Sequence, residues 1–221
     1  MEGYHPAVEE YLETILELEE SGIRPMRARI VERLGVSAPA VSETVRRLER
    51  EGYLTLDESR AIRLTSEGRN YATSIMRRHR LAERLLTDVL KVPWSQVHEE
   101  AGRLEHAISP RLEAHLVALL GDPGTCPHGN PIPGSVNAVS VATQVPLGTV
   151  DAGATVVVRR IDEEIEGQYD RMQELEAGGV MPGHMLVVLD GAADDQQRFN
   201  SDGADILLDR SVTAKVYVTL E

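Results

Sequence analysis

The hydrophobic periodicity of the chain changes once, near residue 134, and this change divides it into two parts. Before that point, apolar residues recur at the spacing of amphipathic helices. After residue 150, short runs rich in valine and leucine alternate with glycine, proline and aspartate, which is typical of short strands. We therefore predict a mainly α-helical protein with a C-terminal all-β domain folded as a small β-barrel.

Turn signals subdivide the helical part. Three helical segments and two short alternating runs around a polar turn at 57–60 follow the element order of a winged helix-turn-helix domain. Long helical patterns then run from Ser66 to Leu90 and from Trp94 to about Leu120, and a Gly/Pro-rich loop closes the region. The predicted divisions are 1–72 for the winged helix-turn-helix domain, 73–134 for a helical domain, 135–150 for a linker and 151–221 for the barrel.

Composition excludes several classes of protein. The only cysteine is Cys126, so the chain can form neither an internal disulfide nor a four-cysteine zinc site. No stretch approaches the ~18 consecutive apolar residues of a transmembrane helix. Met1–His5 shows no basic segment followed by an apolar one, as a secretion signal would. We therefore expect a cytoplasmic protein with no membrane partner.

Charge is distributed unevenly along the chain. The formal net charge is −13, yet residues 21–80 contain 13 arginines against 7 acidic side chains. A basic block within an acidic chain fits a DNA-binding module joined to a region that handles cations. Solvated charge on helix faces is the alternative interpretation.

The helix predicted over 39–50 would enter the major groove, with the hairpin beside it. Arginines would position the protein on phosphates, whereas base-edge contacts would carry the sequence specificity. A helical protein-interaction domain with the same turn is the alternative. The candidates for DNA contact are the hydroxyl side chains of Ser37, Ser42 and Thr44 and the guanidinium groups of Arg27, Arg46, Arg47, Arg50 and Arg60.

Histidine and glutamate side chains share one face on each of two successive predicted helices. His79 and Glu83 stand four residues apart on the first, so they project together. The matching face of the second carries His98, Gly102, Glu105 and His106. Imidazole and carboxylate without a thiol suit Mn²⁺, Fe²⁺ or Zn²⁺, and this pattern predicts a divalent-metal site. Glu10, on an acidic helix face, is a further candidate ligand; the alternative is a solvated surface glutamate.

Cys126 and His128 lie two residues apart in the Gly/Pro-rich loop, where they could form a nucleophile pair. Because no third group or motif supports that chemistry, we predict that they serve the structure of the loop. The sequence also lacks a phosphate-binding glycine motif and a nucleophile elbow.

These features together resemble the metal-dependent repressors of the diphtheria toxin repressor and manganese transport regulator family. The resemblance is carried, in order and over residues 1 to about 134, by RPMRARIVERLGVSAPAVSETVRRLEREGYL, TSEGRNYATSIMRRHRLAERLLTDVL, VHEEAGRLEHAIS and HGNPIPG. It implies a homodimer with a winged-helix domain, a helical metal-binding and dimerisation domain with two metal sites, and a mobile small barrel.

The resemblance also implies particular ligands and DNA contacts. The ancillary metal site would comprise His79, Glu83 and His98, and the primary site Glu10, Gly102, Glu105 and His106. The implied DNA contacts are Arg27, Ser37, Pro39, Ser42, Arg50 and Arg60. Iron-responsive members carry methionine and cysteine at the positions of Glu10 and Gly102, whereas manganese-responsive members usually carry carboxylates. Gly102 offers only its backbone carbonyl, but the carboxylate of Glu10 favours a hard ion.

The resulting hypothesis is a metal-dependent transcriptional repressor that binds palindromic double-stranded operator DNA as a dimer and controls metal homeostasis genes. Manganese(II) is the favoured cofactor, and iron(II) is the alternative within the same family. A winged-helix regulator that responds to an organic ligand or protein partner is the alternative from another class, and metal-independent operator binding would favour it. A metalloenzyme would need an open coordination position with a positioned acid or base. Because the sequence shows neither, we predict no enzyme activity.

Overall fold

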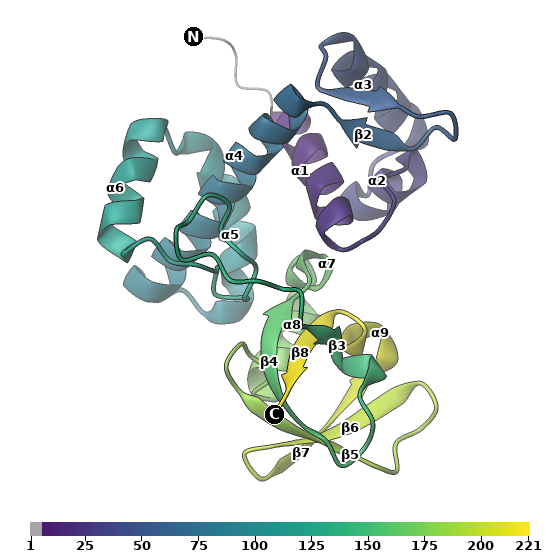
Figure 1. Ribbon diagram of the computed structural model, residues 1–221, viewed down its shortest axis with the longest axis vertical. Helices are drawn as coiled ribbons and strands as arrows, with labels where there is room; N and C mark the ends of the chain where they lie inside the picture. Colours follow the sequence, from purple (N-terminus) through teal and green to yellow (C-terminus); the bar gives the residue numbers. More distant parts are fainter. Residues whose placement is uncertain (1–5) are drawn as a thin grey trace. The chain divides into compact units, whose positions relative to one another are not determined.

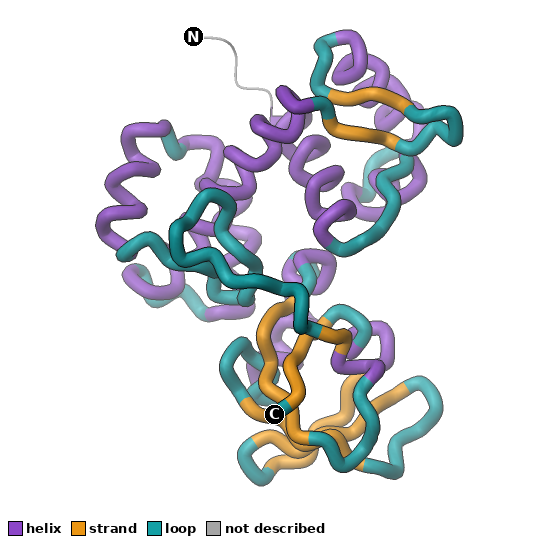
Figure 2. The backbone as a smooth tube through the Cα atoms, viewed as in Figure 1, coloured by secondary structure: helices purple, strands orange, loops and turns teal. Residues whose placement is uncertain are grey.

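A computed structural model describes residues 6–221, which fold into two compact units (Figures 1 and 2). Unit 1 comprises the chain up to His79 together with Glu105–Ser109, and unit 2 comprises Arg80–Leu104 and Pro110–Glu221. The segment Met1–His5, in which the sequence shows no secretion signal, lies outside the described residues. No helix within the described part of the chain is long and apolar enough to cross a membrane.

Unit 1 contains a helix-turn-helix and a two-stranded antiparallel hairpin (Figure 1). Its elements are α1 (Pro6–Glu20), α2 (Arg27–Leu34), α3 (Ala38–Arg50), β1 (Leu54–Leu56), β2 (Ile62–Leu64), most of α4 (Ser66–Arg84) and the short turn η3 (Glu105–Ala107). The apolar faces of α1 and α3 meet in one core, where Leu12, Val41 and Val45 are fully buried. The predicted winged helix-turn-helix is confirmed.

Local sequence signals define the turn between α2 and α3. Gly35 ends α2 in the left-handed conformation, with φ of 65°, which glycine adopts without a steric penalty. Ser37 caps α3 by accepting a hydrogen bond from the amide of Ala40 at 3.4 Å, and Pro39 lies in the first helical turn. Ser37 therefore has a structural role independent of any contact with DNA.

Asp57 organises the turn of the hairpin. Its Oδ1 accepts hydrogen bonds from the amides of Ser59 and Ala61, at 3.0 and 2.9 Å, and Arg24 Nη2 donates to Oδ2 at 3.0 Å. Arg60, at the tip, has a φ of 63° and is exposed. The Ser59 hydroxyl also donates to Oδ1, at 2.6 Å, and this bond, with those from the Ala61 amide and Arg24, holds the pKa of Asp57 well below its usual range.

We expect the hairpin to resist acid because of this lowered pKa. A carboxyl group whose pKa is depressed in the folded state stabilises it above the unfolded pKa, and loses that contribution only as the pH falls through the folded value. The amide proton shift of Ala61, followed by NMR, should therefore stay constant as the pH falls through about 4. Asp57→Asn should change this shift at neutral pH, whereas the exposed neighbour variant Glu58→Gln should not. A titration midpoint near 4 in the wild type would contradict the assignment.

The helical part of unit 2 is more interrupted than the sequence predicts. Its elements are the end of α4, the wide turn η1 (Leu85–Val89), the turn η2 (Trp94–Gln96), α5 (Val97–Leu104) and α6 (Pro110–Leu120). The prediction of one helix from Trp94 to about Leu120 is wrong, because the chain leaves the helix after Ala107 and starts again at Pro110. Proline lacks an amide hydrogen and restricts the preceding residue, so Pro110 begins a helix rather than continuing one.

The C-terminal part of unit 2 is built on a six-stranded antiparallel sheet in the order β3-β8-β4-β5-β6-β7 (Figure 2). The strands are β3 (Val145–Pro146), β4 (Thr155–Ile161), β5 (Met185–Leu189), β6 (Gln196–Ser201), β7 (Ala204–Asp209) and β8 (Val216–Leu220). Within the described residues the edge strands β3 and β7 do not pair, so the predicted small barrel is an open six-stranded sheet. The edge strand β3 is only two residues long, and Pro146 has no amide hydrogen to extend a ladder.

Helices also interrupt the region predicted to be all-β. They are the turn η4 (Leu147–Thr149), α7 (Glu163–Glu166), α8 (Tyr169–Ala177) and α9 (Arg210–Thr213). Trp94, from the helical part of unit 2, packs into the same core as Leu175 and Phe199 of this domain. The aromatic ring therefore links the two parts of unit 2 through buried apolar surface.

Candidate metal centre

Three buried ligand side chains converge in unit 1. Glu13 on α1, His79 on α4 and Glu105 on η3 place their ligand atoms within 4.8 Å of one another. Nδ1 of His79 lies 2.5 Å from Oε2 of Glu105 and 3.9 Å from Oε1 of Glu13. His106 adjoins them, with its Nε2 3.4 Å from Oε1 of Glu105.

The donor set in unit 1 fits a divalent cation. Three carboxylates (Glu9, Glu13 and Glu105) are buried beside the imidazoles of His79 and His106, and Arg78 Nη2 lies 4.0 Å from Glu9 Oε1. Buried carboxylates are costly unless cations compensate them. A divalent ion would supply that compensation, and a set of carboxylates and imidazoles without a thiol favours Mn²⁺, Fe²⁺ or Zn²⁺.

Two residues of the predicted primary site are placed differently. Glu10 is exposed on α1, and no donor cluster found among the described residues includes it. Gly102 lies half-buried on α5, where an added Cβ would meet no other atom within 4 Å. Sequence interpretation missed Glu13, although a signal was present: Glu9 and Glu13, four residues apart, fall on the buried stripe of α1.

A second cluster lies in unit 2. Glu83, Cys126 and His128 are all buried and place their ligand atoms within 4.8 Å of one another. Glu166 on α7 joins them, since its Oε2 lies 2.9 Å from His128 Nδ1 and 3.3 Å from His98 Nδ1. Oε1 of Glu83 lies 3.3 Å from Nδ1 of each of these histidines. Two carboxylates and two imidazoles thus surround one small volume.

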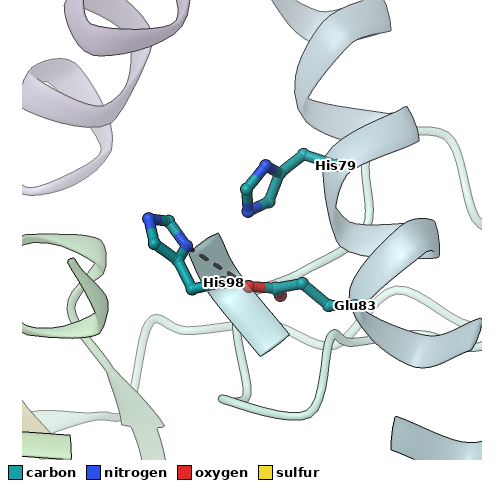
Figure 3. A group of neighbouring side chains, drawn as sticks. All are labelled: His79, Glu83 and His98. Carbon is teal, nitrogen blue, oxygen red and sulfur yellow. Dashed lines mark hydrogen bonds and ion pairs between the residues drawn. The ribbon is translucent and has the colours of Figure 1, made fainter. Parts of the chain in front are cut away.

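Figure 3 shows the residues of the predicted ancillary site. His79 and Glu83 project from successive turns of α4, and Nδ1 of His98 points toward the Glu83 carboxylate. The sequence interpretation assigned Cys126 and His128 to the loop and missed their position beside Glu83. A signal was present in the sequence. Cys126 and His128 can both bind metal and lie two residues apart, in a loop that has no charged residue after Asp122.

Electrostatics in unit 2 also indicate a cation site. Burial alone would lower the pKa of His128, but the carboxylates of Glu166 and Glu83 outweigh it and raise the pKa well above its ordinary value. Burial, with the nearby Glu83 carboxylate, raises the pKa of Cys126 to about 12. His128 Nδ1 and Glu166 Oε2 form a buried pair at 2.9 Å. The raised pKa reflects two buried carboxylates that need positive charge, which a metal ion at this position would supply.

The surrounding residues fix the ring of His128. Its Nε2 donates to the backbone oxygen of Trp94 at 3.1 Å, so Nδ1 faces the carboxylates. The indole of Trp94 packs edge-on against the ring and donates to the Pro127 oxygen at 3.1 Å. Asn130 Nδ2 donates to Glu166 Oε1 at 2.5 Å, which fixes the carboxylate in turn. Partners of this kind orient metal ligands.

The predicted DNA-contacting residues lie on α2, α3 and the hairpin. Ser37, Pro39, Arg50 and Arg60 are exposed, whereas Arg27 and Ser42 are half-buried. Four of the six side chains therefore lie at the surface, and the assignment of individual DNA contacts stays a prediction.

Family profiles match most of the helical part of the chain. Residues 5–62 match the N-terminal DNA-binding domain of the iron-dependent repressors. Residues 65–134 match the metal-binding and dimerisation domain of the same repressors.

Whole-chain comparisons find relatives and similar structures. The iron-dependent repressor IdeR of Mycobacterium tuberculosis is 46% identical over 189 residues, which cover 81% of this chain and 82% of IdeR. The diphtheria toxin repressor of Corynebacterium jeikeium is 39% identical over 220 residues, covering 90% and 91%. A manganese-dependent transcriptional repressor solved with manganese superposes with a TM-score of 0.84 at 32% identity, covering 97% and 100% of the two chains.

Proposed function

Since this chain belongs to the diphtheria toxin repressor family of metal-dependent transcriptional repressors, we propose that Mn²⁺ is its activating metal. In this proposal a homodimer loaded with Mn²⁺ binds a palindromic operator and represses metal homeostasis genes. Iron is the second candidate, because the relatives IdeR and the iron-dependent repressor profiles are named for it.

The observation that carries the manganese proposal is the donor set of Glu13, His79 and Glu105. The three side chains offer hard oxygen and imidazole ligands and no thiol or thioether, which favours Mn²⁺ relative to softer sites. Mn²⁺ remains the weakest binder of its series in absolute affinity, so selectivity must come from geometry. Glu10 and Gly102 stay proposed as further contributors, the first through its carboxylate and the second through its backbone oxygen.

Metal and DNA binding would be coupled through α1. Glu13 belongs to this helix, and the neighbouring Leu12 is buried in the core that also holds Val41 and Val45 of α3. A bound cation supplies the positive charge that lets Glu13, His79 and Glu105 close on one point. Closure then favours one position of α1 and, through the shared core, of α3, which is a population shift toward the DNA-binding geometry.

The unit 2 cluster is proposed as the second, ancillary site. The donors there would be Glu83, His98, His128 and Glu166. Cys126 also lies in this cluster, and its thiol, once deprotonated by a bound ion, would make the cluster softer than the one in unit 1 and favour Fe²⁺ or Zn²⁺. The two clusters would therefore differ in metal preference.

The dimer is proposed to form on the helical surface of unit 2. Leu112 and Leu119 of α6 are 44% and 63% exposed, and Val89 and Leu90 are 47% and 59% exposed. Exposed large apolar side chains are candidates for burial in a protein contact. These residues fall within the matched dimerisation profile at 65–134.

A metal titration of operator affinity tests the proposed function. An operator duplex selected from random DNA in the presence of Mn²⁺ is labelled, and fluorescence anisotropy is followed against free Mn²⁺, Fe²⁺, Co²⁺ and Zn²⁺ under anaerobic conditions. We expect Mn²⁺ to activate binding at least as fully as Fe²⁺, and a chelator to abolish it. Specific sites are typically bound about 10³- to 10⁷-fold more tightly than random DNA, so the loss is large.

The titration separates the candidates. Activation by Fe²⁺ without activation by Mn²⁺ would replace the manganese proposal with the iron one. Equal operator affinity with and without chelator would remove metal dependence altogether and favour a regulator that answers to an organic ligand or protein. Random duplex DNA at matched salt serves as the control, because binding to phosphates alone needs no metal and weakens with salt.

A further inference from the structure

The carboxylate of Glu9 lies between a tyrosine hydroxyl and a candidate metal ligand in unit 1. Its Oε2 is 2.5 Å from Nδ1 of His106, and Tyr71 donates its hydroxyl hydrogen to Oε1 at 2.7 Å. Glu9 is 9% exposed, and the His106 side chain 7%. Both oxygens of this buried carboxylate are therefore occupied by neighbouring side chains.

The hydrogen bond fixes which ring nitrogen of His106 faces the metal cluster. With Nδ1 directed at Glu9, Nε2 points toward Glu105, whose Oε1 lies 3.4 Å away. Glu105 in turn reaches His79 through its other oxygen, at 2.5 Å. A carboxylate that accepts the Nδ1 hydrogen selects one tautomer of the imidazole and leaves the Nε2 lone pair available.

Tyr71 supports the carboxylate from the other side. Burial and the hydrogen bond to Glu9 raise the pKa of Tyr71, so the hydroxyl remains a donor. The ring of Tyr71 also packs against Tyr53, with centroids 5.7 Å apart. The hydroxyl is therefore anchored by its own packing and restrains the rotation of Glu9.

We propose that Glu9 is a positioning residue, which orients His106 for metal through the Nδ1 hydrogen bond and is itself held by Tyr71. This inference rests on the proposed function, because it assumes that His106 binds the activating metal. The bond joins α1 to the 105–107 turn, both in unit 1. A cation on Nε2 makes Nδ1–H a stronger donor, so metal occupancy would tighten the hold of His106 on α1.

The closing experiment measures Mn²⁺ affinity and the protonation of the ring. Glu9→Gln keeps the shape of the side chain and removes its charge, and loss of such an outer partner typically lowers metal affinity about 10- to 100-fold. Mn²⁺ binding is measured by electron paramagnetic resonance on the full chain, and we expect Tyr71→Phe to give a smaller loss in the same direction. Glu19→Gln is the matched control. Glu19 lies on the same helix and pairs with the exposed Arg69, so the Mn²⁺ affinity of this variant should equal that of the wild type.

Ring nitrogen NMR on wild-type protein loaded with Zn²⁺, a diamagnetic probe, does not depend on any variant folding. We expect His106 to carry hydrogen on Nδ1 and metal on Nε2. A metal-bound Nδ1, or a Glu9→Gln variant with wild-type Mn²⁺ affinity, overturns the inference. If His106→Ala binds Mn²⁺ as tightly as the wild type, the assignment of His106 as a ligand fails instead, so the two failures are distinguishable.

Discussion

Glu105→Gln is expected to abolish metal-dependent operator binding. Glu105 is 1% exposed and reaches two candidate ligands at once, with Oε2 2.5 Å from His79 Nδ1 and Oε1 3.4 Å from His106 Nε2. Glutamine keeps the volume but removes the charge and replaces one oxygen with an amide nitrogen that does not bind metal. We expect the Mn²⁺ concentration needed for operator binding to rise more than about 100-fold. Loss of a residue that only orients a ligand lowers metal affinity about 10- to 100-fold, and loss of a ligand should cost more.

Two measurements check this expectation. Operator anisotropy against free Mn²⁺ should show no transition in the range that saturates the wild type, while salt-sensitive binding to random DNA persists. The melting temperature of the wild type should rise with Mn²⁺ concentration, because a ligand that binds the folded state stabilises it by mass action. The melting temperature of Glu105→Gln should rise less than that of the wild type, because only the unit 2 cluster is then left to bind the ion.

Glu100→Gln provides the matched control for Glu105→Gln. Glu100 lies on the adjacent helix α5, is exposed and pairs with Arg103 at 2.6 Å, so it carries the same charge change away from the cluster. Wild-type activation by Mn²⁺ in Glu105→Gln would show that this carboxylate is structural. Equal impairment of both variants would point to a general effect of charge.

The winged helix-turn-helix could be predicted because its signals are local. Gly35, Ser37 and Pro39 specify the end of one helix and the start of the next through backbone conformation and a single hydrogen bond. Alternation on either side of Asp57 predicts the hairpin for the same reason. Each of these features depends on residues within a few positions of one another.

Helical spacing predicted some of the residues that the structure brings together in the two candidate clusters. The i, i+4 spacing predicted that His79 and Glu83 share a helix face, and that the residues from His98 to His106 share another. Such a prediction needs only the helix itself and no tertiary contact. The spacing could not choose among the acidic residues of α1. Glu9 and Glu13 are buried and Glu10 is exposed, and only the packing of α1 decides this.

Patterns of this kind could not predict that Glu166, Cys126 and His128 lie beside Glu83. Glu166 comes from α7, a four-residue helix within a region that alternates like strands, so no helical period marks it. His128 is positioned by the backbone oxygen of Trp94, and Gly129, with φ of 90°, lets the loop approach the backbone of Arg159. These contacts join segments far apart in sequence, which single-sequence patterns do not report. Whether the sheet closes into a barrel also depends on the pairing of strands far apart in sequence, so the strand pattern could not predict that it stays open.

Arg80→Met is expected to cause a large loss of stability in unit 2. Arg80 is 1% exposed, and its Nε and Nη2 donate to Glu163 Oε1 at 3.0 and 2.8 Å. Its Nη1 donates to the Pro131 oxygen at 2.5 Å, so one guanidinium joins α4, the Gly/Pro-rich loop and α7. Methionine leaves the Glu163 carboxylate buried without this guanidinium, and breaking a buried pair costs about 3–5 kcal/mol.

Urea unfolding of the metal-free protein measures this loss as a lower midpoint with an unchanged slope. Arg103→Met is the matched control, because Arg103 pairs only at the surface with Glu99 and Glu100, where an exposed ion pair contributes about 0–1 kcal/mol. A loss in Arg80→Met no larger than that of the control would contradict the role assigned to the buried pair.

The double variant Arg80→Met/Glu163→Leu separates the penalty of a stranded charge from the loss of packing. Replacing both members of a buried ion pair with apolar side chains of similar volume is often neutral or stabilising, because neither charge then needs compensation. We therefore expect the double variant to recover most of the stability that Arg80→Met loses. A double variant as unstable as the single one would mean that the hydrogen bond to Pro131 and the position of α7, rather than the charge of Glu163, depend on Arg80.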